Sequence, residues 1–251
     1  TTFDDRDGQF LIGFDLASDL PALAPGEFFQ VDSLTLTATH STGSFVYDPS
    51  YDGYRTYLDA TDPAFLADAD AGRPIVLSGA GLKSSVGYTA FSFNDIAGPT
   101  PASSPPFYGE AETFGFGDPT AKDTRSAFAY DPNSVAPGNP FGNISNNVAD
   151  GFDFKPFALG TTTSLSAGDS VGEAVPGSAP GTTFTFSVDV ADAGIQSYLG
   201  DGLAAGGLFF SITSLHPTTQ TGGANPNFYT ADNFDPAALP VVRRALDRDA
   251  A

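Results

Sequence analysis

The fold is decided by residues 188–212, VDVADAGIQSYLGDGLAAGGLFFSI. Four apolar side chains in this stretch follow the i, i+3, i+4, i+8 spacing that places them on one face of a helix: Ile195, Tyr198, Leu199 and Leu203. Asp189 or Asp192 can cap the start of this helix, because a short acidic side chain accepts hydrogen bonds from the first free amides. Gly206 and Gly207 can end it. The stretch therefore predicts one short helix.

Apolar runs on both sides of this helix predict strands. Residues 182–190, TTFTFSVDV, alternate in the period of two that is typical of a half-buried strand. Their apolar face holds Phe184, Phe186 and Val188. Residues 208–212, LFFSI, form a continuous apolar run that indicates a buried strand. We expect the helix to close one open end of a β-sandwich and to bury Tyr198 and Leu199 over its core.

The remainder of the chain carries more strand and turn signals. Strands are predicted over residues 9–16, 28–39, 44–47, 74–77, 86–93 and 152–159. Pro, Gly, Ser and Asn accumulate between them, and we expect a long loop-rich insertion at about residues 98–180 that stays ordered because it carries many Phe side chains. The sequence predicts an all-β fold in a single domain over residues 1–251. We expect an antiparallel β-sandwich of jelly-roll type, with one short helix and long ordered loops.

The charge balance excludes some partners. The chain of 251 residues has 30 acidic and 10 basic residues, for a formal charge of −20. Duplex nucleic acid and anionic membrane surfaces would be repelled, because both need clustered Lys and Arg. Many of the Asp residues precede Gly or Pro, which favours a role in turns and solubility. Examples are Asp48-Pro49, Asp52-Gly53, Asp118-Pro119 and Asp131-Pro132.

The chain contains no Cys and no Met. Disulfides, thiolate metal sites and a thiol nucleophile are thereby excluded. Because Thr1 is not a translation start, we expect a processed N-terminus, most simply after removal of a secretion signal. No run approaches the roughly 20 apolar residues that would span a bilayer, so no membrane insertion is expected. These features predict a secreted protein, extracellular or at the cell surface.

Short motifs at both ends of the chain resemble a known class of modules. They are FLIGFDL near the start, SLTLT at residues 33–37, VDV at residues 188–190 and GLFF at residues 207–210. Together they resemble secreted bacterial jelly-roll domains of the DNRLRE type and their carbohydrate-binding-module-like relatives. The resemblance implies a jelly-roll fold and an exported protein. The chain departs from the pattern in having Tyr198 where the helix of the family carries Trp, and in its long central segment.

No constellation of residues predicts an enzyme. Two His are too few for a three-His zinc site, and the GxSxG motif of a nucleophile elbow does not occur. The four Glu do not single out a carboxylate pair for glycoside hydrolysis, and no phosphate loop or dinucleotide fingerprint is present. We expect a non-enzymatic protein.

Clusters of Asp near both ends of the chain suggest a Ca²⁺ site. Calcium takes six to eight hard oxygen ligands, which Asp-rich loops supply. The clusters contain Asp4, Asp5, Asp7, Asp232 and Asp235. Their spacing is not that of an EF-hand, so the alternative is again turn chemistry.

Two further features bear on partners. Three of the seven Arg, namely Arg243, Arg244 and Arg248, lie in the last nine residues, and a basic tail on so acidic a chain can bind the acidic face of another copy. The alternative is a tail folded onto its own domain. The segment YDPSYDGYRTY instead offers Tyr47, Tyr51, Tyr54 and Tyr57 as a platform for sugar rings.

These features rank three functions. The leading hypothesis is a secreted structural protein that associates with copies of itself as a subunit of an extracellular filament or surface matrix. The alternative is a carbohydrate-binding module with polysaccharide as its partner, and an enzyme is third.

Overall fold

The structure of the protein is a computed structural model. It describes residues 9–16, 18–42, 45–84, 87–90, 127–140, 142–145, 147–171, 181–214, 227–228 and 243–245. The strands are β1 (Gln9–Asp15), β2 (Ser33–Thr42), β3 (Phe45–Asp48), β4 (Arg73–Ser84), β5 (Gly87–Ala90), β6 (Ala127–Tyr130), β7 (Ala158–Thr161), β8 (Ser170–Val171), β9 (Thr183–Ser187), β10 (Gly207–Ser214), β11 (Asn227–Phe228) and β12 (Arg243–Ala245). The helices are α2 (Asn147–Asp150), α3 (Ala193–Ala204) and the 3-10 turns η2 (Tyr54–Thr56) and η6 (Pro132–Ser134).

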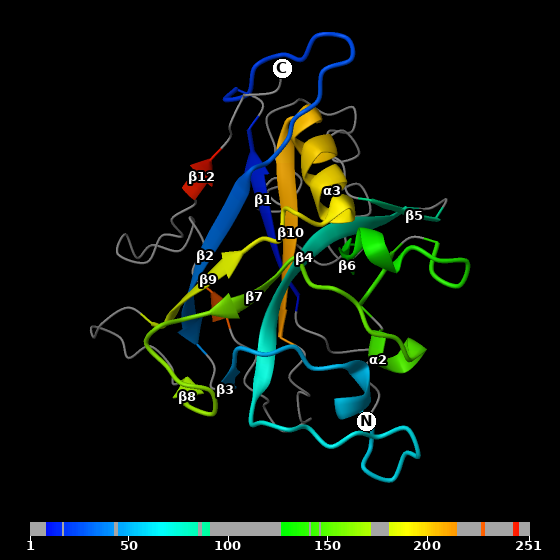
Figure 1. Ribbon diagram of the computed structural model, residues 1–251, viewed down its shortest axis with the longest axis vertical. Helices are drawn as coiled ribbons and strands as arrows, with labels where there is room; N and C mark the ends of the chain where they lie inside the picture. Colours follow the sequence, from blue (N-terminus) through cyan, green and yellow to red (C-terminus); the bar gives the residue numbers. More distant parts are fainter. Residues whose placement is uncertain are drawn as a thin grey trace, which may run out of the picture.

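The strands form one curled, mainly antiparallel sheet with the order β1-β10-β4-β7-β9-β2-β11 (Figure 1). The short pair between β3 and β4 is parallel, with Tyr47 opposite Arg73. Among the described residues, α3 is the one α-helix longer than a single turn. The all-β class with one short helix is therefore confirmed. No helix within the described ranges is long and apolar enough to cross a membrane.

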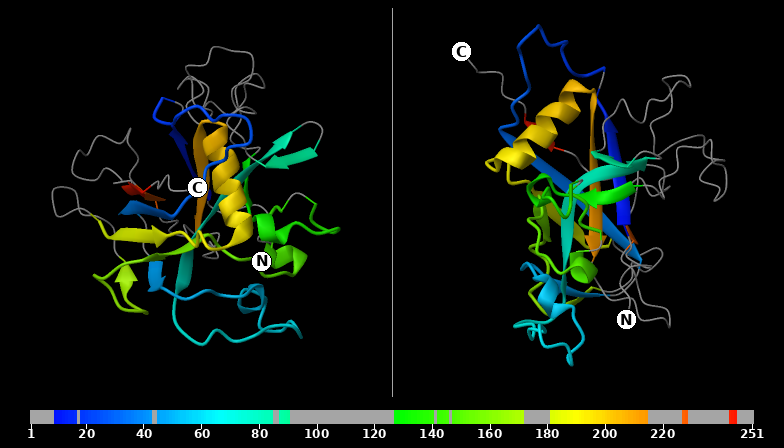
Figure 2. Two further views of the ribbon diagram at one scale, coloured as in Figure 1. Left: turned by 45° about the horizontal axis from the view of Figure 1, so that its top comes forward. Right: turned by 90° about the vertical axis from the view of Figure 1, so that its right-hand side faces the viewer.

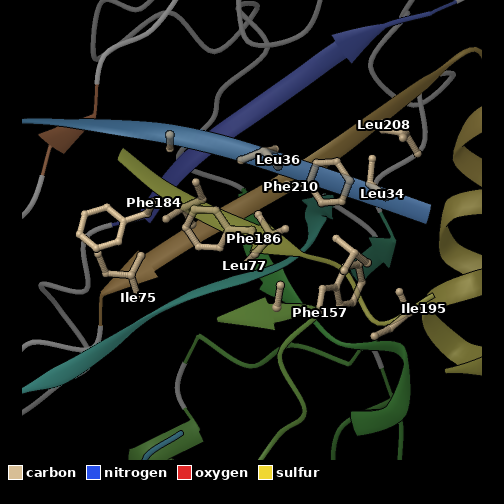
Figure 3. Close-up of a cluster of buried hydrophobic side chains, with 14 of the residues drawn as sticks. Leu34, Leu36, Ile75, Leu77, Phe157, Phe184, Phe186, Ile195, Leu208 and Phe210 are labelled. Carbon is tan, nitrogen blue, oxygen red and sulfur yellow. The ribbon is translucent and has the colours of Figure 1, made fainter. Parts of the chain in front are cut away.

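The sheet curls at β7, so that its two halves face one another. β7 pairs with β4 through Leu159 and Ala158 alone, and with β9 through Gly160 and Thr161. Such short pairings let the strand direction turn sharply between the halves. Figure 3 shows the result, in which side chains of β2 and β9 meet those of β4 and β10 in a common core. That core includes Leu34, Leu36, Ile75, Leu77, Phe184, Phe186 and Phe210.

Alternation along the strands decides which side chains enter this core. In β9, Phe184 and Phe186 are fully buried while Thr183 and Ser187 are exposed, as the period of two predicts. β4 is buried on both faces. Its Ile75 and Leu77 enter the main core, whereas Val76 enters a second cluster with Tyr57, which also contains Ala129, Ile144, Val148 and Phe154.

Helix α3 begins and packs as its sequence predicts. The side chain of Asp192 caps it by accepting hydrogen bonds from the backbone amides of Gly194 and Ile195. The helix ends at Ala204, and Gly206 follows with a φ of 93°. The buried residues Ile195, Leu199 and Leu203 face the sheet. Figure 2 shows α3 lying beside β10 at one end of the sheet.

Tyr198 of α3 joins two strands where their pairing ends. The β10–β4 ladder stops at Phe210 opposite Gly79. One step further, the Tyr198 hydroxyl accepts a hydrogen bond from Ala80 N at 2.9 Å and donates one to Phe209 O at 2.7 Å. It therefore satisfies backbone groups that would otherwise lose their ladder partners.

Glycine at position 79 makes room for this arrangement. A Cβ there would lie 3.0 Å from the Tyr198 ring, 3.0 Å from Tyr130 and 3.1 Å from Phe157. The three rings close over the strand, with centroids 5.5 Å apart for Tyr130 and Tyr198 and 5.3 Å apart for Phe157 and Tyr198. The packing of Tyr198 against β4 therefore depends on the absence of a side chain at position 79.

The described parts of the two chain ends pair within the chain itself. β1 pairs with β10 along its whole length, from Gln9 opposite Thr213 to Asp15 opposite Gly207. Near the other end, β12 pairs with β2, with Arg244 opposite Leu34. Part of the segment expected to be loop-rich also contributes to the sheet, because β6 and β7 pair with β4 and β8 pairs with β3.

Candidate functional site

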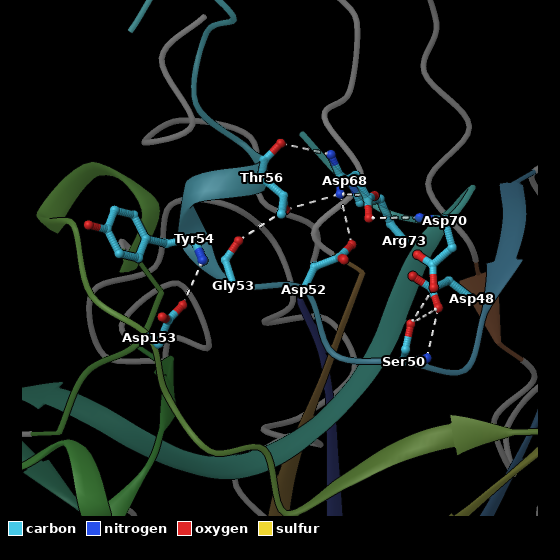
Figure 4. A network of polar contacts seen from close by, with 10 residues as sticks. All are labelled: Asp48, Ser50, Asp52, Gly53, Tyr54, Thr56, Asp68, Asp70, Arg73 and Asp153. Atoms are coloured by element: carbon cyan, nitrogen blue, oxygen red, sulfur yellow. Dashed lines mark hydrogen bonds and ion pairs between the residues drawn. The ribbon is translucent and has the colours of Figure 1, made fainter. Parts of the chain in front are cut away.

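The connection that runs from β3 to β4 lies at the end of β4 farthest from α3 (Figure 1). Polar and charged side chains gather in this connection. β3 ends at Asp48, the connection includes η2, and β4 begins at Arg73. The parallel pairing of Tyr47 with Arg73 and of Asp48 with Pro74 holds both ends of the connection together. Figure 4 shows the resulting network, with carboxylates placed around Arg73 and around Ser50.

Arg73 neutralises one part of this network. Its Nη1 lies 2.8 Å from Asp52 Oδ2 and 2.7 Å from Asp68 Oδ2, and its Nη2 donates to Thr56 O at 3.0 Å. The guanidinium also lies over the Tyr57 ring, 4.2 Å from the centroid. With the Arg73 side chain 15% exposed and that of Asp52 5%, this ion pair is largely shielded from water.

Asp48 is buried without a balancing cation. It is 1% exposed, and its Oδ1 accepts hydrogen bonds from Ser50 N at 2.7 Å and from Ser50 Oγ at 2.6 Å. Its Oδ2 is buried and has no hydrogen-bond partner. Within the described part of the chain, Asp48 forms no ion pair. Burying a carboxylate oxygen without a hydrogen-bond partner costs free energy of folding, so most such oxygens in proteins have a partner.

Two further carboxylates lie beside Asp48. One carboxylate oxygen each from Asp48, Asp52 and Asp70 lies within 4.8 Å of the others. The two buried members, Asp48 and Asp52, repel one another by about 3 kcal/mol when a dielectric constant of ~20 is used. Ser50 Oγ lies 2.9 Å from Asp70 Oδ2 as well as close to Asp48, and its single proton can serve only one of the two carboxylates. The three carboxylates therefore carry more negative charge than their neighbours offset.

Burial shifts the titration of groups in this region. It raises the pKa of Asp52 above its usual range, against the opposing effects of the hydrogen bond and the charge of Arg73. Burial also raises the pKa of Tyr51 to about 12, although a hydrogen bond from the Phe154 amide lowers it. Burial at this site therefore disfavours the charged form of both groups.

Gly72 allows the connection to approach Asp48. Its φ is 114°, a backbone conformation that other residues rarely adopt. A Cβ at this position would lie 2.7 Å from Val46 O and 3.1 Å from Asp48 Cβ. Glycine is therefore required for the chain to enter β4 alongside β3.

The structure contradicts the expectation that four tyrosines form an exposed platform. Tyr47 is 3% exposed, and its hydroxyl accepts a hydrogen bond from Thr162 N at 3.1 Å. Tyr57 is 8% exposed and lies under Arg73. Both rings are buried because the alternation of β3 turns Tyr47 toward Phe184 and because η2 packs onto the second cluster.

The other two tyrosines are partly buried. The Tyr51 ring packs edge-on against Phe154, with centroids 5.7 Å apart, and its hydroxyl accepts a hydrogen bond from Phe154 N. Tyr54 packs against the same cluster, and its backbone amide donates to Asp153 Oδ1 at 2.7 Å. These residues tie the β3–β4 connection to the chain beyond α2 and do not present a row of open faces.

The other predicted site residues are only partly described. The expected calcium ligands Asp4, Asp5, Asp7, Asp232 and Asp235 lie outside the described residues, as does Arg248. Arg243 and Arg244 lie in β12, where their backbone pairs with Thr35 and Leu34 of the same chain.

Sequence reasoning missed the carboxylates that the fold brings together. It assigned Asp48 and Asp52 to turns and left Asp70 unassigned. A usable signal was present, because the segment DPSYD is followed by the closely spaced acidic residues of DADAG before the next strand. What the sequence lacked was the parallel β3–β4 pairing, which folds these two segments onto one another.

Comparison with known proteins adds no relative. The chain matches no protein-family model. Neither a curated protein nor a solved structure is significantly similar to it.

Proposed function

We propose that this protein is a secreted, non-enzymatic structural protein whose copies associate into an extracellular filament or surface matrix. The observation that carries the proposal is the position of β12. This strand of three residues, two of them Arg, pairs with β2 near the end of a chain whose formal charge is −20. Because β2 pairs with β9 on its other side, β12 itself lies at the edge of the sheet, which is the kind of surface that recruits further strands.

A short terminal strand on a sheet edge can be exchanged between copies. The three residue pairs that hold β12 on β2 would form equally well with β2 of a neighbouring copy. If the exchange runs head to tail, it does not close and yields a polymer. The basic side chains of Arg243 and Arg244 would strengthen such a contact with an acidic neighbour.

The jelly-roll resemblance supports export. We propose that the curled sheet is a jelly-roll-type sandwich, in which β2 and β9 pack over β4 and β10 and α3 closes one end. The shared core between these strands supports this reading. By analogy with the secreted jelly-roll modules that the chain resembles, we propose that the protein is extracellular or at the cell surface.

The alternative of a carbohydrate-binding module loses its main support. Binding of a sugar ring requires an open aromatic face, and Tyr47 and Tyr57 are buried. Retention on a polysaccharide column by dispersed monomers would nevertheless favour it over the structural role.

Electron microscopy and light scattering of the purified chain test the proposal. Long polymers are expected for the natural sequence, and dispersed monomers for a double variant with Arg243→Glu and Arg244→Glu. The matched control is Arg243→Lys with Arg244→Lys, which keeps the charge and should polymerise. Monomers at every concentration of the natural chain, or equal polymerisation of the Glu variant, would contradict the proposal.

A further inference from the structure

We infer that Asp48, Asp52 and Asp70 form a Ca²⁺-binding site that fastens the β3–β4 connection to the sheet. One oxygen from each of these three carboxylates lies within 4.8 Å of the others. Asp48 adds the decisive observation, because its buried Oδ2 has no partner. The site is distinct from the predicted Asp clusters near the two chain ends.

The local charge requires a cation. Arg73 is committed to Asp52 and Asp68, at 2.8 and 2.7 Å. Asp48 and Asp70 form no ion pair with any described residue, and they share the single proton of Ser50. One divalent ion among the three carboxylates offsets this charge and fills the open coordination position of Asp48.

The ligand chemistry favours calcium. All three ligands are hard carboxylate oxygens, and neither His nor Cys belongs to the group. Ca²⁺ accepts six to eight oxygens in an adaptable arrangement, whereas Mg²⁺ demands a near-ideal octahedron and keeps most of its waters. The ligands come from a strand end and from two points of an irregular connection, which suits the more adaptable ion.

The exposure of Asp70 gives the ion a route to the two buried ligands. Asp48 and Asp52 are 1% and 5% exposed, whereas Asp70 lies at the surface. Figure 4 shows Asp48, Asp70 and Ser50 close together at the end of the network away from Tyr54. Water on the side of Asp70 can complete the coordination, as is usual for calcium sites with few protein ligands.

The bound ion would join the start of the β3–β4 connection, which supplies Asp48 and Asp52, to its end, which supplies Asp70. Asp48 ends β3, Asp52 precedes η2, and Asp70 lies just before β4. The connection between β3 and β4 is therefore expected to be more stable with calcium than without it. This inference does not rest on self-association, since the ligands lie within one copy.

Titration of metal-free chain with Ca²⁺ tests the inference. Isothermal calorimetry and the thermal midpoint are measured for the natural chain, for Asp48→Asn and for Asp32→Asn. Asp32 is exposed, lies outside the cluster and serves as a control with the same change of charge. Calcium should raise the midpoint of the natural chain and of Asp32→Asn by several degrees. Asp48→Asn should bind about tenfold or more weakly, because one of three charged ligands is lost.

A second prediction separates this site from any other calcium site of the chain. Without calcium, Asp48→Asn should be at least as stable as the natural chain, because the amide keeps the oxygen that accepts from Ser50 and removes a buried charge. With calcium, their order should reverse. Asp70→Asn should also weaken calcium binding. Because Asp70 is exposed, this variant provides the test if Asp48→Asn does not fold. Unchanged binding in both variants, or no binding by the natural chain, would overturn the inference.

Discussion

The two ends of β4 solve the problem of buried polar groups in opposite ways. At the α3 end, the Tyr198 hydroxyl pairs with Ala80 N and Phe209 O, so the backbone groups exposed by the diverging strands are satisfied. At the other end, Asp48 keeps an open oxygen in a buried position, next to Asp52. Figure 2 shows α3 and the β3–β4 connection at opposite ends of the molecule.

This difference indicates that the α3 end has a structural role and that the acidic end is the candidate binding site. A satisfied polar group such as the Tyr198 hydroxyl stabilises the fold without further partners. An open carboxylate among other carboxylates destabilises the fold until something binds to it. The α3 end is therefore expected to respond to loss of packing, and the acidic end to charge, calcium and pH.

The largest effect is expected at the α3 end. Phe157 is 1% exposed and contacts both Tyr198 and Phe210. Phe157→Ala should lower the free energy of unfolding by about 3–5 kcal/mol, since it leaves a cavity in the core. Denaturant titration measures this loss. Phe28→Ala, at a side chain that is 76% exposed, is the control and should change stability little. A small loss at Phe157 would mean that the core under α3 is loosely packed.

The second-largest loss of stability is expected at the acidic end, when the guanidinium of Arg73 is removed. Arg73→Ala leaves Asp52 buried without its ion pair and removes the contact with the Tyr57 ring. The free energy of unfolding should fall by about 3 kcal/mol in the absence of calcium. Arg55→Ala, at an exposed position of η2, is the control. Equal stability of the two variants would show that Arg73 offsets little of the charge.

A smaller effect isolates the hydroxyl of Tyr198. Tyr198→Phe keeps the ring but removes the hydroxyl that accepts from Ala80 N and donates to Phe209 O. A loss of about 1–3 kcal/mol is expected from denaturant titration, because these backbone groups stay buried. Tyr130→Phe removes a hydroxyl that forms no hydrogen bond within the described residues, and it should cost less. Similar costs for both variants would argue against the bridge.

The smallest effect concerns the cap of α3 and its pH dependence. A hydrogen bond from Asn133, one from the Ile195 amide and one from Lys155 hold the pKa of Asp192 at about 2. Because this pKa is depressed, the stabilisation is present above the unfolded pKa of ~3.9 and is lost as the pH falls toward 2. Asp192→Ala should cost about 1 kcal/mol at neutral pH.

The stabilities of Asp192→Ala and of the natural chain should converge at low pH, as measured by thermal denaturation at several pH values. Asp201→Asn lies in the same helix but not at its cap, and it serves as the control. A cost that stays constant down to pH 2 would exclude the charged cap as its source.

Much of the α3 end could be predicted from the sequence. The helical spacing of Ile195, Leu199 and Leu203 and the alternation of Phe184 and Phe186 are local patterns, and the burial of each of these residues agrees with them. The capping role of Asp192 was one of two predicted alternatives. The packing of Tyr198 from α3 against β4 also needs Gly79, and its importance appears only where three aromatic rings meet above it.

Little of the acidic end could be predicted. Asp48-Pro49 and Asp52-Gly53 have the local pattern of ordinary turns, and Tyr47 and Tyr57 lie in a segment that looks exposed. Their burial follows from contacts with Phe184 and with the cluster of Phe154, which are distant in the sequence.

The sequence by itself determined the β-rich class, the position of helix α3 and the faces of several strands, because these depend on periodicities within a few residues. Only the tertiary structure decided which carboxylates share a site. Asp48 and Asp70 are separated by a connection of irregular backbone, and their distance depends on the parallel pairing of β3 with β4 and on the positive φ of Gly72. No local pattern encodes such a distance, because it is set by packing between segments that the sequence keeps apart.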